Sequence, residues 1–401
     1  MINQAIQMVL LNPVCISLIF AGVIVGIVFG SIPGLSASMA MILFLPMSFG
    51  MEPMNGISLL VGLYMGGISG GLISAILLKI PGTASSIATV FDGGPMADKG
   101  EAGRALGVGI LTSFVGGLLS IFALMFISPY LAKVTLAFTS AEYFSIALFA
   151  LTIISSLSGK SLINGILAGL FGIALSLVGI APVDGAIRFG NSQLYGGFDT
   201  VVILIGMYAV TDIIRTGFER RHIVGDSSKY TYNLKGYGIS VKEYLSHWRL
   251  IIQSALIGLG IGILPGIGGS TSSLLAYSAG KSASKYPEKF GTGIVDGIIA
   301  SETSNNAVIG GSLIPLITMG IPGNVATAIF LGGLTIHGIA PGPLIFQKSG
   351  QYVYGIFIAL LIANVFMVIF ERAGLRLFVK MLDIPKYILL PIVMVCCVVG
   401  A

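Results

Sequence analysis

The fold is decided by a stretch that occurs twice: GSIPGLS at residues 30–36 and GILPGIG at residues 262–268. Each copy follows an apolar run whose glycines are four residues apart, so the glycines share one helix face. Proline lacks an amide hydrogen and glycine tolerates unusual dihedrals, so each Pro-Gly pair predicts a helix break. Because lipid cannot satisfy the exposed backbone groups, such a break within a membrane must be surrounded by protein or water.

A second pair of breaks is expected further along each half of the chain. IPGT occupies residues 80–83 and IPGN occupies residues 321–324, each after a Gly-Gly pair. The first motif recurs after 232 residues (30 to 262) and the second after 241 (80 to 321). These similar offsets predict an internal duplication. Matching interruptions in two hydrophobic halves are typical of a transporter's binding site. The orientation of the repeats, inverted or parallel, stays open.

The composition places the chain in a membrane. Of 401 residues, 55% are hydrophobic and 9% are charged, against about 25% charged in soluble domains. The mean hydropathy is +0.98, and several apolar runs exceed the length of about 18 residues that spans a bilayer. These values exclude a soluble enzyme and a disordered chain, and the continuous runs exclude a porin. We predict an all-α polytopic membrane protein with two internal repeats of Pro-Gly-broken helices, about ten transmembrane elements and several half-length ones.

One polar segment divides the chain. Residues 218–248 carry more basic than acidic side chains, so the positive-inside rule places this loop in the cytoplasm. We expect an N-terminal transmembrane repeat with scaffold helices at 1–217 and a C-terminal transmembrane repeat at 249–401. The last residues, 387–401, are nearly all apolar, so we expect truncation at residue 401. The net charge of +5 fits basic loops better than nucleic-acid binding.

Small polar residues follow each of the four breaks. A helix N-terminus has free N–H donors and about half a positive charge, which makes it a ready anion site. Four such helix starts near the midplane could hold a carboxylated molecule, and the same side chains also fit ordinary helix caps. The candidate substrate-binding residues are Ser36, Ser38, Gly82, Thr83, Ser85, Ser86, Gly268, Ser270, Thr271, Gly323, Asn324 and Thr327.

Acidic and amide side chains give the candidate coupling-ion site. Glu302, Asn305 and Asn306 share one helical face. Their oxygens suit Na⁺, or Glu302 could centre a proton relay, and an aqueous loop around Glu302 is the alternative. Asp92 is a further coupling-ion candidate, although its charged neighbours also fit an interfacial loop. Lys79 could offer a cation to an anionic substrate or could extend to the headgroups. No other cofactor is expected.

Five long motifs run in order over nearly the whole chain: GSIPGLSASMA at 30–40, GGLISAILLKIPGTASSIATVFDGGPMADKGEAGRALG at 70–107, GIGILPGIGGSTSSLLAY at 260–277, KYPEKFGTGIVDGIIASETSNNAVIGGSLIPL at 285–316, and GIPGNVATAIFLGGLTIHGIAPGPLIF at 320–346. Together they resemble the large membrane subunit of the tripartite tricarboxylate transporters. The resemblance implies a secondary transporter subunit of the cell membrane (the inner membrane in a Gram-negative cell). It would import a tricarboxylate or related organic anion with Na⁺ or H⁺. It also implies a small four-span membrane subunit and an extracytoplasmic solute-binding protein as partners.

The chain departs from the family pattern beside Glu302. The family motif usually has a proline where this chain has Ser301, which changes the expected local helix geometry. The resemblance and the repeats together suggest alternating access, in which the broken helices move in an elevator-like way past uninterrupted scaffold helices.

Two other functions stay open. GISGG at residues 67–71 fits the G-x-S-x-G pattern around Ser69, and His337 could supply a base, so an intramembrane serine hydrolase is one alternative. A passive anion channel is the other, and it predicts no dependence on Glu302. Because no G-x-x-x-x-G-K-[ST] motif occurs, energy must come from an ion gradient or another chain.

Overall fold

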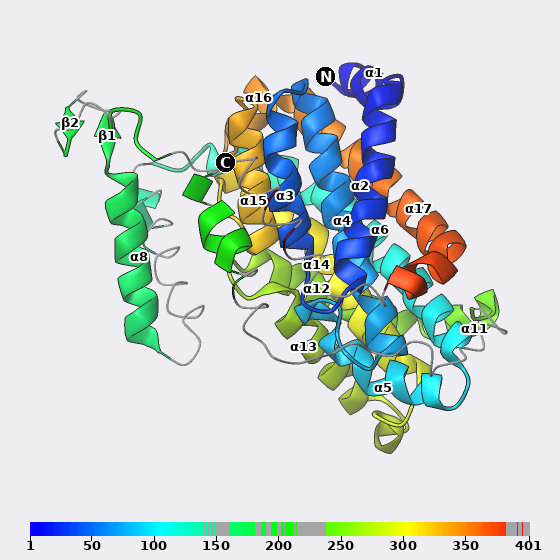
Figure 1. Ribbon diagram of the computed structural model, residues 1–401. Helices are drawn as coiled ribbons and strands as arrows, with labels where there is room; N and C mark the ends of the chain where they lie inside the picture. Colours follow the sequence, from blue (N-terminus) through cyan, green and yellow to red (C-terminus); the bar gives the residue numbers. More distant parts are fainter. Residues whose placement is uncertain are drawn as a thin grey trace.

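The computed structural model describes residues 1–139, 161–180 and 238–381, together with short stretches between 141 and 214 and residues 391 and 395, and these are mainly helical (Figure 1). Two short strands, β1 (Gly179–Ile180) and β2 (Ile187–Arg188), pair antiparallel. Most of 218–248 and nearly all of 387–401 lie outside the described residues. The three predicted segments, with their two boundaries, therefore stay predictions.

Four helices in the described part are long and apolar enough to cross a membrane. They are α2 (Pro13–Ser31), α4 (Pro53–Leu77), α6 (Ala102–Thr135) and α17 (Gly350–Met381). Four shorter apolar helices accompany them: α3 (Ala37–Phe49), α8 (Leu162–Ser176), α12 (Trp248–Ile263) and α15 (Val325–Ile336). A helical polytopic membrane protein is confirmed, and the half-length elements are present. The number of about ten transmembrane elements stays a prediction.

The four Pro-Gly pairs of the two repeated motifs lie between helices, as the sequence predicts. In the first half the breaks separate α2 from α3, and α4 from the 3₁₀ turn η1 (Ala84–Ser86) that leads into α5 (Ile87–Asp98). In the second half they separate α12 from α13 (Gly268–Ala283), and α14 (Val295–Met319) from α15. The remaining elements are α1 (Ile2–Val9), η3 (Ile205–Val210), α11 (Val241–Ser246), η5 (Pro287–Lys289) and α16 (Ile345–Lys348).

Backbone geometry at the breaks explains why glycine is needed there. Gly34 and Gly266 have φ values of 93° and 82°, in the left-handed region that glycine enters without strain. Gly320, which ends α14, has a φ of 73° and lies in the same region. At the end of α4 the corresponding turn is made by Lys79, with a φ of 56°, although it is not a glycine. A side chain at this position carries a conformational strain that glycine avoids.

Glycine also brings the broken helices into close contact. A Cβ added to Gly26 of α2 would lie 2.6 Å from the carbonyl oxygen of Leu63 in α4. A Cβ added to Gly262 of α12 would lie 2.9 Å from Gly311 Cα in α14. Because these backbones nearly touch, the glycine ladders serve helix–helix packing, as small residues do in membranes.

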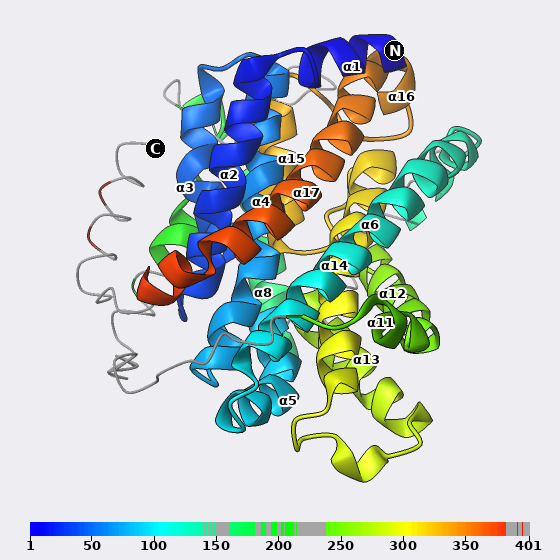
Figure 2. The ribbon, with the colours of Figure 1, turned by 90° about the vertical axis from the view of Figure 1, so that its right-hand side faces the viewer.

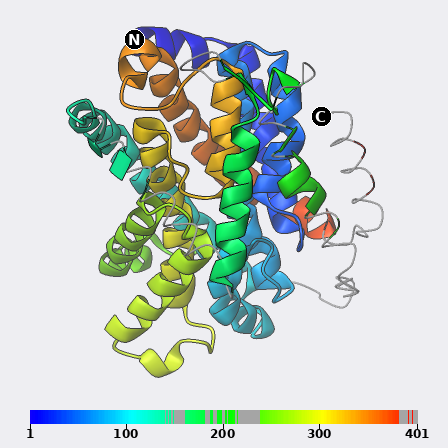
Figure 3. The same ribbon diagram turned by 90° about the vertical axis from the view of Figure 1, so that its left-hand side faces the viewer.

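The long helices α6 and α17 run obliquely across the bundle (Figure 2). α6 packs on α14, and α17 packs on α4 and α2. Helix α8 stands apart from the bundle in Figure 1 and is seen in front of it in Figure 3, and none of its residues is buried. The two long helices also pack against each other. The scaffold role expected for unbroken helices stays a prediction.

Candidate functional site

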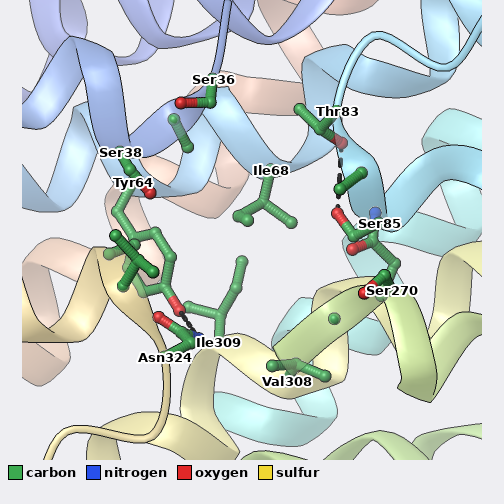
Figure 4. Close-up of a pocket in the computed structure, with 16 residues that line it drawn as sticks. Ser36, Ser38, Tyr64, Ile68, Thr83, Ser85, Ser270, Val308, Ile309 and Asn324 are labelled. Atoms are coloured by element: carbon green, nitrogen blue, oxygen red, sulfur yellow. Dashed lines mark hydrogen bonds between the residues drawn. The ribbon is translucent and has the colours of Figure 1, made fainter. Parts of the chain in front are cut away.

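A cavity of about 200 Å³ lies where the four Pro-Gly breaks meet (Figure 4). This volume suits a small metabolite better than a drug-sized ligand. The breaks are far apart in the sequence, yet each contributes to one wall of this space. The lining residues are Ser36, Ala37, Ser38, Tyr64, Ile68, Thr83, Ala84, Ser85, Gly269, Ser270, Asn305, Val308, Ile309, Asn324, Val325 and Ala326.

Polar side chains stand on two walls of the cavity, with Ile68 between them (Figure 4). On one wall the hydroxyls of Thr83 and Ser85 lie 3.1 Å apart within hydrogen-bond distance. On the other, Asn324 Nδ2 donates to the Tyr64 hydroxyl at 3.1 Å. The second contact joins α4 of the first half to the start of α15 in the second, so both halves shape the cavity.

The structure brings together half of the predicted substrate-binding residues. Six of them line the cavity: Ser36, Ser38, Thr83, Ser85, Ser270 and Asn324. The other six are not among its lining residues: Gly82, Ser86, Gly268, Thr271, Gly323 and Thr327.

Gly82 and Gly323 contribute to packing at the breaks. A Cβ on Gly323 would lie 2.7 Å from the carbonyl oxygen of Gly262, and one on Gly82 would collide with the carbonyl oxygen of Gly30. Each glycine therefore lets the break lie directly against the preceding broken helix. Any larger residue would push the two apart.

Helix capping, the alternative to substrate binding in the sequence, occurs at three of the four breaks. Ser36 caps α3 by accepting from the Met39 amide at 3.1 Å. Thr83 with Ser86, and Asn324 with Thr327, form capping boxes at η1 and α15. Capping does not remove Ser36, Thr83 and Asn324 from the cavity wall, so both roles are compatible.

Helix α13 is the exception, because no side chain caps its N-terminus. Gly269 and Ser270, in its first turn, line the cavity. A 16-residue helix thus presents its N-terminal end, with free N–H donors and a partial positive charge, to the cavity. This end of the cavity favours an anion.

Tyr64 is the main lining residue that the sequence did not single out. It is buried in α4, and its hydroxyl contacts Ser312 of α14 at 3.0 Å as well as Asn324. A tyrosine within an apolar, glycine-rich helix was a detectable signal, because its hydroxyl needs a partner when buried.

No charged side chain is among the described residues that line the cavity. Lys79, considered as a cation for the substrate, pairs instead with Asp98 at 2.6 Å, and both side chains are substantially exposed. An anion in the cavity would therefore be held by hydroxyls, amides and backbone N–H groups.

Glu302 is fully buried in α14, so the aqueous-loop alternative for this residue is wrong. Its carboxylate accepts hydrogen bonds from Thr89 of α5 and, at 3.1 Å, from Ser113 of α6. On the same helix face, Nδ2 of Asn305 and Nδ2 of Asn306 donate to the Glu302 carboxylate at 3.4 and 3.5 Å. Three helices therefore converge on this one acid.

Asn305 connects the Glu302 cluster to the cavity. It lines the cavity, and its Nδ2 donates to Glu302. The Oδ1 atoms of Asn305 and Asn306 are buried and have no hydrogen-bond partner among the described residues. Since an unsatisfied buried acceptor costs about 1–3 kcal/mol, these oxygens are suited to accept a further ligand such as a cation.

Asp92 lies one helical turn from Thr89 on α5 and is also fully buried. Its Oδ1 accepts the amides of Gly291, Gly293 and Ile294 at 2.7–2.9 Å. Its Oδ2 accepts the Tyr277 hydroxyl at 2.8 Å. With these four donors Asp92 anchors the segment that leads into α14, the helix that carries Glu302, and its role in ion coupling stays a prediction.

The family model described as "Tripartite tricarboxylate transporter TctA family" matches residues 16–401. The chain belongs to this family. An uncharacterized 52.8 kDa protein in the TAR-I ttuC' 3' region of Agrobacterium vitis is 34% identical over 390 residues, covering 97% of this chain and 77% of that protein. An uncharacterized protein in the TAR-II ttuC' 3' region of the same organism is 36% identical over 140 residues, covering 35% and 58%. No solved structure matches the chain.

Membership of the TctA family confirms the resemblance found in the sequence. The protein is a tricarboxylate-transport subunit of the cytoplasmic membrane with multiple membrane-spanning helices. A transporter family also favours a non-enzymatic role over the hydrolase alternative.

Geometry separates the two residues that the hydrolase alternative needs. The His337 ring lies against Gly56, near the start of α4. Ser69 is thirteen positions further along the same helix, a rise of about 20 Å. His337 therefore cannot act as a base for Ser69 in this TctA-family protein.

Proposed function

We propose that this chain imports a tricarboxylate or related organic anion through the cavity, coupled to Na⁺ or H⁺ bound near Glu302. The observation that carries the proposal is Asn305, which lines the cavity and donates to the buried Glu302 carboxylate. A cation that draws on the Asn305 oxygen would fix the same side chain that faces the substrate. Binding of the two would thus favour each other.

The chemistry of the cavity supports an anionic substrate. Its hydroxyl and amide groups come from Thr83, Ser85, Ser270 and Asn324, and α13 points its N-terminus at it. Because the described lining has no cation, a multiply charged anion would gain from a positive ion bound nearby. The Glu302 cluster has the oxygen ligands for such an ion.

We further propose that the cavity lies between two structural repeats. Fourteen of its sixteen lining residues form pairs at the two offsets found in the sequence, with Ser36 and Val308 as the exceptions. The capping boxes at 83–86 and 324–327 are also separated by 241 residues, as are the left-handed Lys79 and Gly320. The pairs are Ala37 with Gly269, Ser38 with Ser270, Tyr64 with Asn305, Ile68 with Ile309, Thr83 with Asn324, Ala84 with Val325, and Ser85 with Ala326.

The proposed complex contains two further proteins. An extracytoplasmic solute-binding protein delivers the substrate, and a small four-span membrane subunit completes the transporter. The name of the tripartite family supports a complex of three components, and the nature of the two partners is part of the proposal.

Uptake in sealed vesicles tests the proposal. The full complex is reconstituted with its binding protein and offered labelled di- and tricarboxylates, with and without an inward Na⁺ or H⁺ gradient. Accumulation above equilibrium that requires a gradient supports coupled transport. Equilibration without any gradient dependence would indicate the passive anion channel, and hydrolysis with no uptake would indicate the enzyme.

A further inference from the structure

A second buried acid lies outside the Glu302 cluster. Glu371 on α17 is fully buried, and neither of its carboxyl oxygens completes a hydrogen bond with the described residues. The polar group that faces it is the Ser69 hydroxyl of α4, which is buried and also without a completed hydrogen bond. Two unsatisfied groups facing each other between α17 and α4 form a polar pair inside an apolar contact.

Within the part of the chain that the structure covers, no described contact gives this pair a compensating positive charge. α1, α2 and α4 contain no charged residue, and Arg372, next on α17, is exposed. Glu302 is the charged group whose electrostatic field reaches Glu371. The helices packed against α17 carry six titratable side chains, and the described contacts place none of them on this carboxyl. They are Cys15 of α2, Tyr64 of α4, Arg104, Tyr130 and Lys133 of α6, and Lys348 of α16.

We propose that Glu371 and Ser69 form a proton-binding site, separate from the cation site at Glu302. A carboxylate buried without a partner is costly, and the neutral acid avoids this cost. The negative charge of Glu302 adds to the preference for a neutral Glu371. A hard metal ion is disfavoured, because it takes about six oxygen ligands and this pair offers only a carboxyl and a hydroxyl.

The location connects the proposed site to the moving parts of the transporter. Ser69 follows Ile68, which lines the cavity, so the two faces of α4 touch the substrate space and Glu371. A movement of α4 against α17 would open the pair to water. One carboxyl oxygen would then bind a proton from one side of the membrane and release it to the other. This inference rests on the proposed transport function.

Infrared difference spectroscopy of the complete membrane complex tests the site without depending on transport. Wild type is expected to show a protonated-carboxyl band near neutral pH, which moves in heavy water and is absent in E371Q. The band should persist in E302Q. Absence of the band in wild type, or its persistence in E371Q, would overturn the proposal.

The hydroxyl partner gives a second measurement. S69A should move the frequency of the band, because the acid loses the group that faces it. S74A is the matched control, since Ser74 is also buried in α4 without a hydrogen-bond partner among the described residues, and should leave the frequency unchanged. Equal frequencies in S69A and wild type would contradict the assignment of Ser69. If E371Q does not assemble, the proposal is decided by the other two variants. It then requires a shifted band in S69A and a retained band in E302Q.

Uptake measurements then separate this proposal from the function itself. In E371Q the ratio of uptake with and without an inward proton gradient should fall to unity, with the response to a Na⁺ gradient retained. A proton response unchanged in E371Q would overturn the role of the site while leaving the proposed function intact. Absence of carboxylate uptake in wild type would instead contradict the proposed function, whatever the infrared result.

Discussion

Helices α4 and α14 have the same length, 25 residues each, and both lead into a Pro-Gly break beside the cavity, but they differ in chemistry. α14 carries Glu302, Asn305 and Asn306, whereas α4 has Val61, Tyr64 and Met65 at the positions 241 residues earlier. The acid that faces α4, Glu371, comes from another helix. Similar backbones thus carry different side chains: α14 has the groups for an ion, and α4 has an aromatic wall.

The largest effect is expected from removing the α14 acid. Glu302→Gln should lower gradient-driven uptake by at least about 10–100-fold, because the loss of even an outer partner of an ion ligand typically costs this much. The exposed acid Glu288 provides the matched control, and Glu288→Gln should transport like wild type. Vesicle uptake normalised to the amount of inserted protein measures both. Equal transport in the two variants would remove the asymmetry between α4 and α14.

The paired cavity positions on the two helices give a sharper comparison. Asn305→Ala should weaken both substrate and cation binding, about tenfold each, because Asn305 contacts the cavity and Glu302. Tyr64→Phe should weaken substrate binding less and leave cation affinity unchanged, since the described hydrogen bonds of the Tyr64 hydroxyl go to Asn324 and Ser312 and not to Glu302. Calorimetric titration with each ligand, in the presence and absence of the other, tests this. Loss of cation affinity in Tyr64→Phe would show that α4 also contributes to the ion site.

The second break of each half, at Gly82 and at Gly323, should be equally sensitive to an added methyl group. Gly82→Ala and Gly323→Ala each place a Cβ against a backbone carbonyl, and overpacking of this kind costs about 1–3 kcal/mol. Gly50→Ala is the control, because nothing lies within 4 Å of the added Cβ. Thermal unfolding in detergent should therefore show lower midpoints for the first two variants only. A fall in one half alone would argue against equivalent roles for the two glycines.

The sequence was sufficient for the helix breaks and much of the cavity, because proline, glycine and capping residues act locally. Six of twelve candidate residues line the cavity, and Glu302 with its two asparagines could be recognised from helical spacing. Gly82 and Gly323 could not be distinguished from ligands, since their role depends on helices far away in the sequence. Glu371 was not singled out for the same reason: it directly follows an apolar run, and only the packing of α17 against its neighbouring helices buries it.

The smallest effect is expected at the start of α14, which is fastened in a way that α4 is not. Glu52, at the start of α4, forms no cap with its side chain, whereas Asp296 in the first turn of α14 pairs with His247 at 2.9 Å. His247 precedes α12 in the polar segment. The hydrogen bond with Asp296 raises the pKa of His247 above its ordinary value of 6.5, partial burial opposes this, and the Glu243 carbonyl adds to the increase.

The direction of the pH dependence follows from that raised pKa. The ion pair stabilises the folded state fully below the ordinary pKa of histidine, and the contribution is lost as pH rises through the raised folded-state pKa. His247→Gln should therefore lower the free energy of unfolding, and with it the unfolding midpoint, more at pH 5.5 than at pH 8.5. The two losses of free energy should differ by about 1 kcal/mol or less, because the pair is partly exposed. Asp296→Asn should show the same dependence, and the double variant should add little to either. A His247→Gln effect that is independent of pH would mean that the histidine holds α14 by packing alone, and the two helix starts would then differ in shape and not in charge.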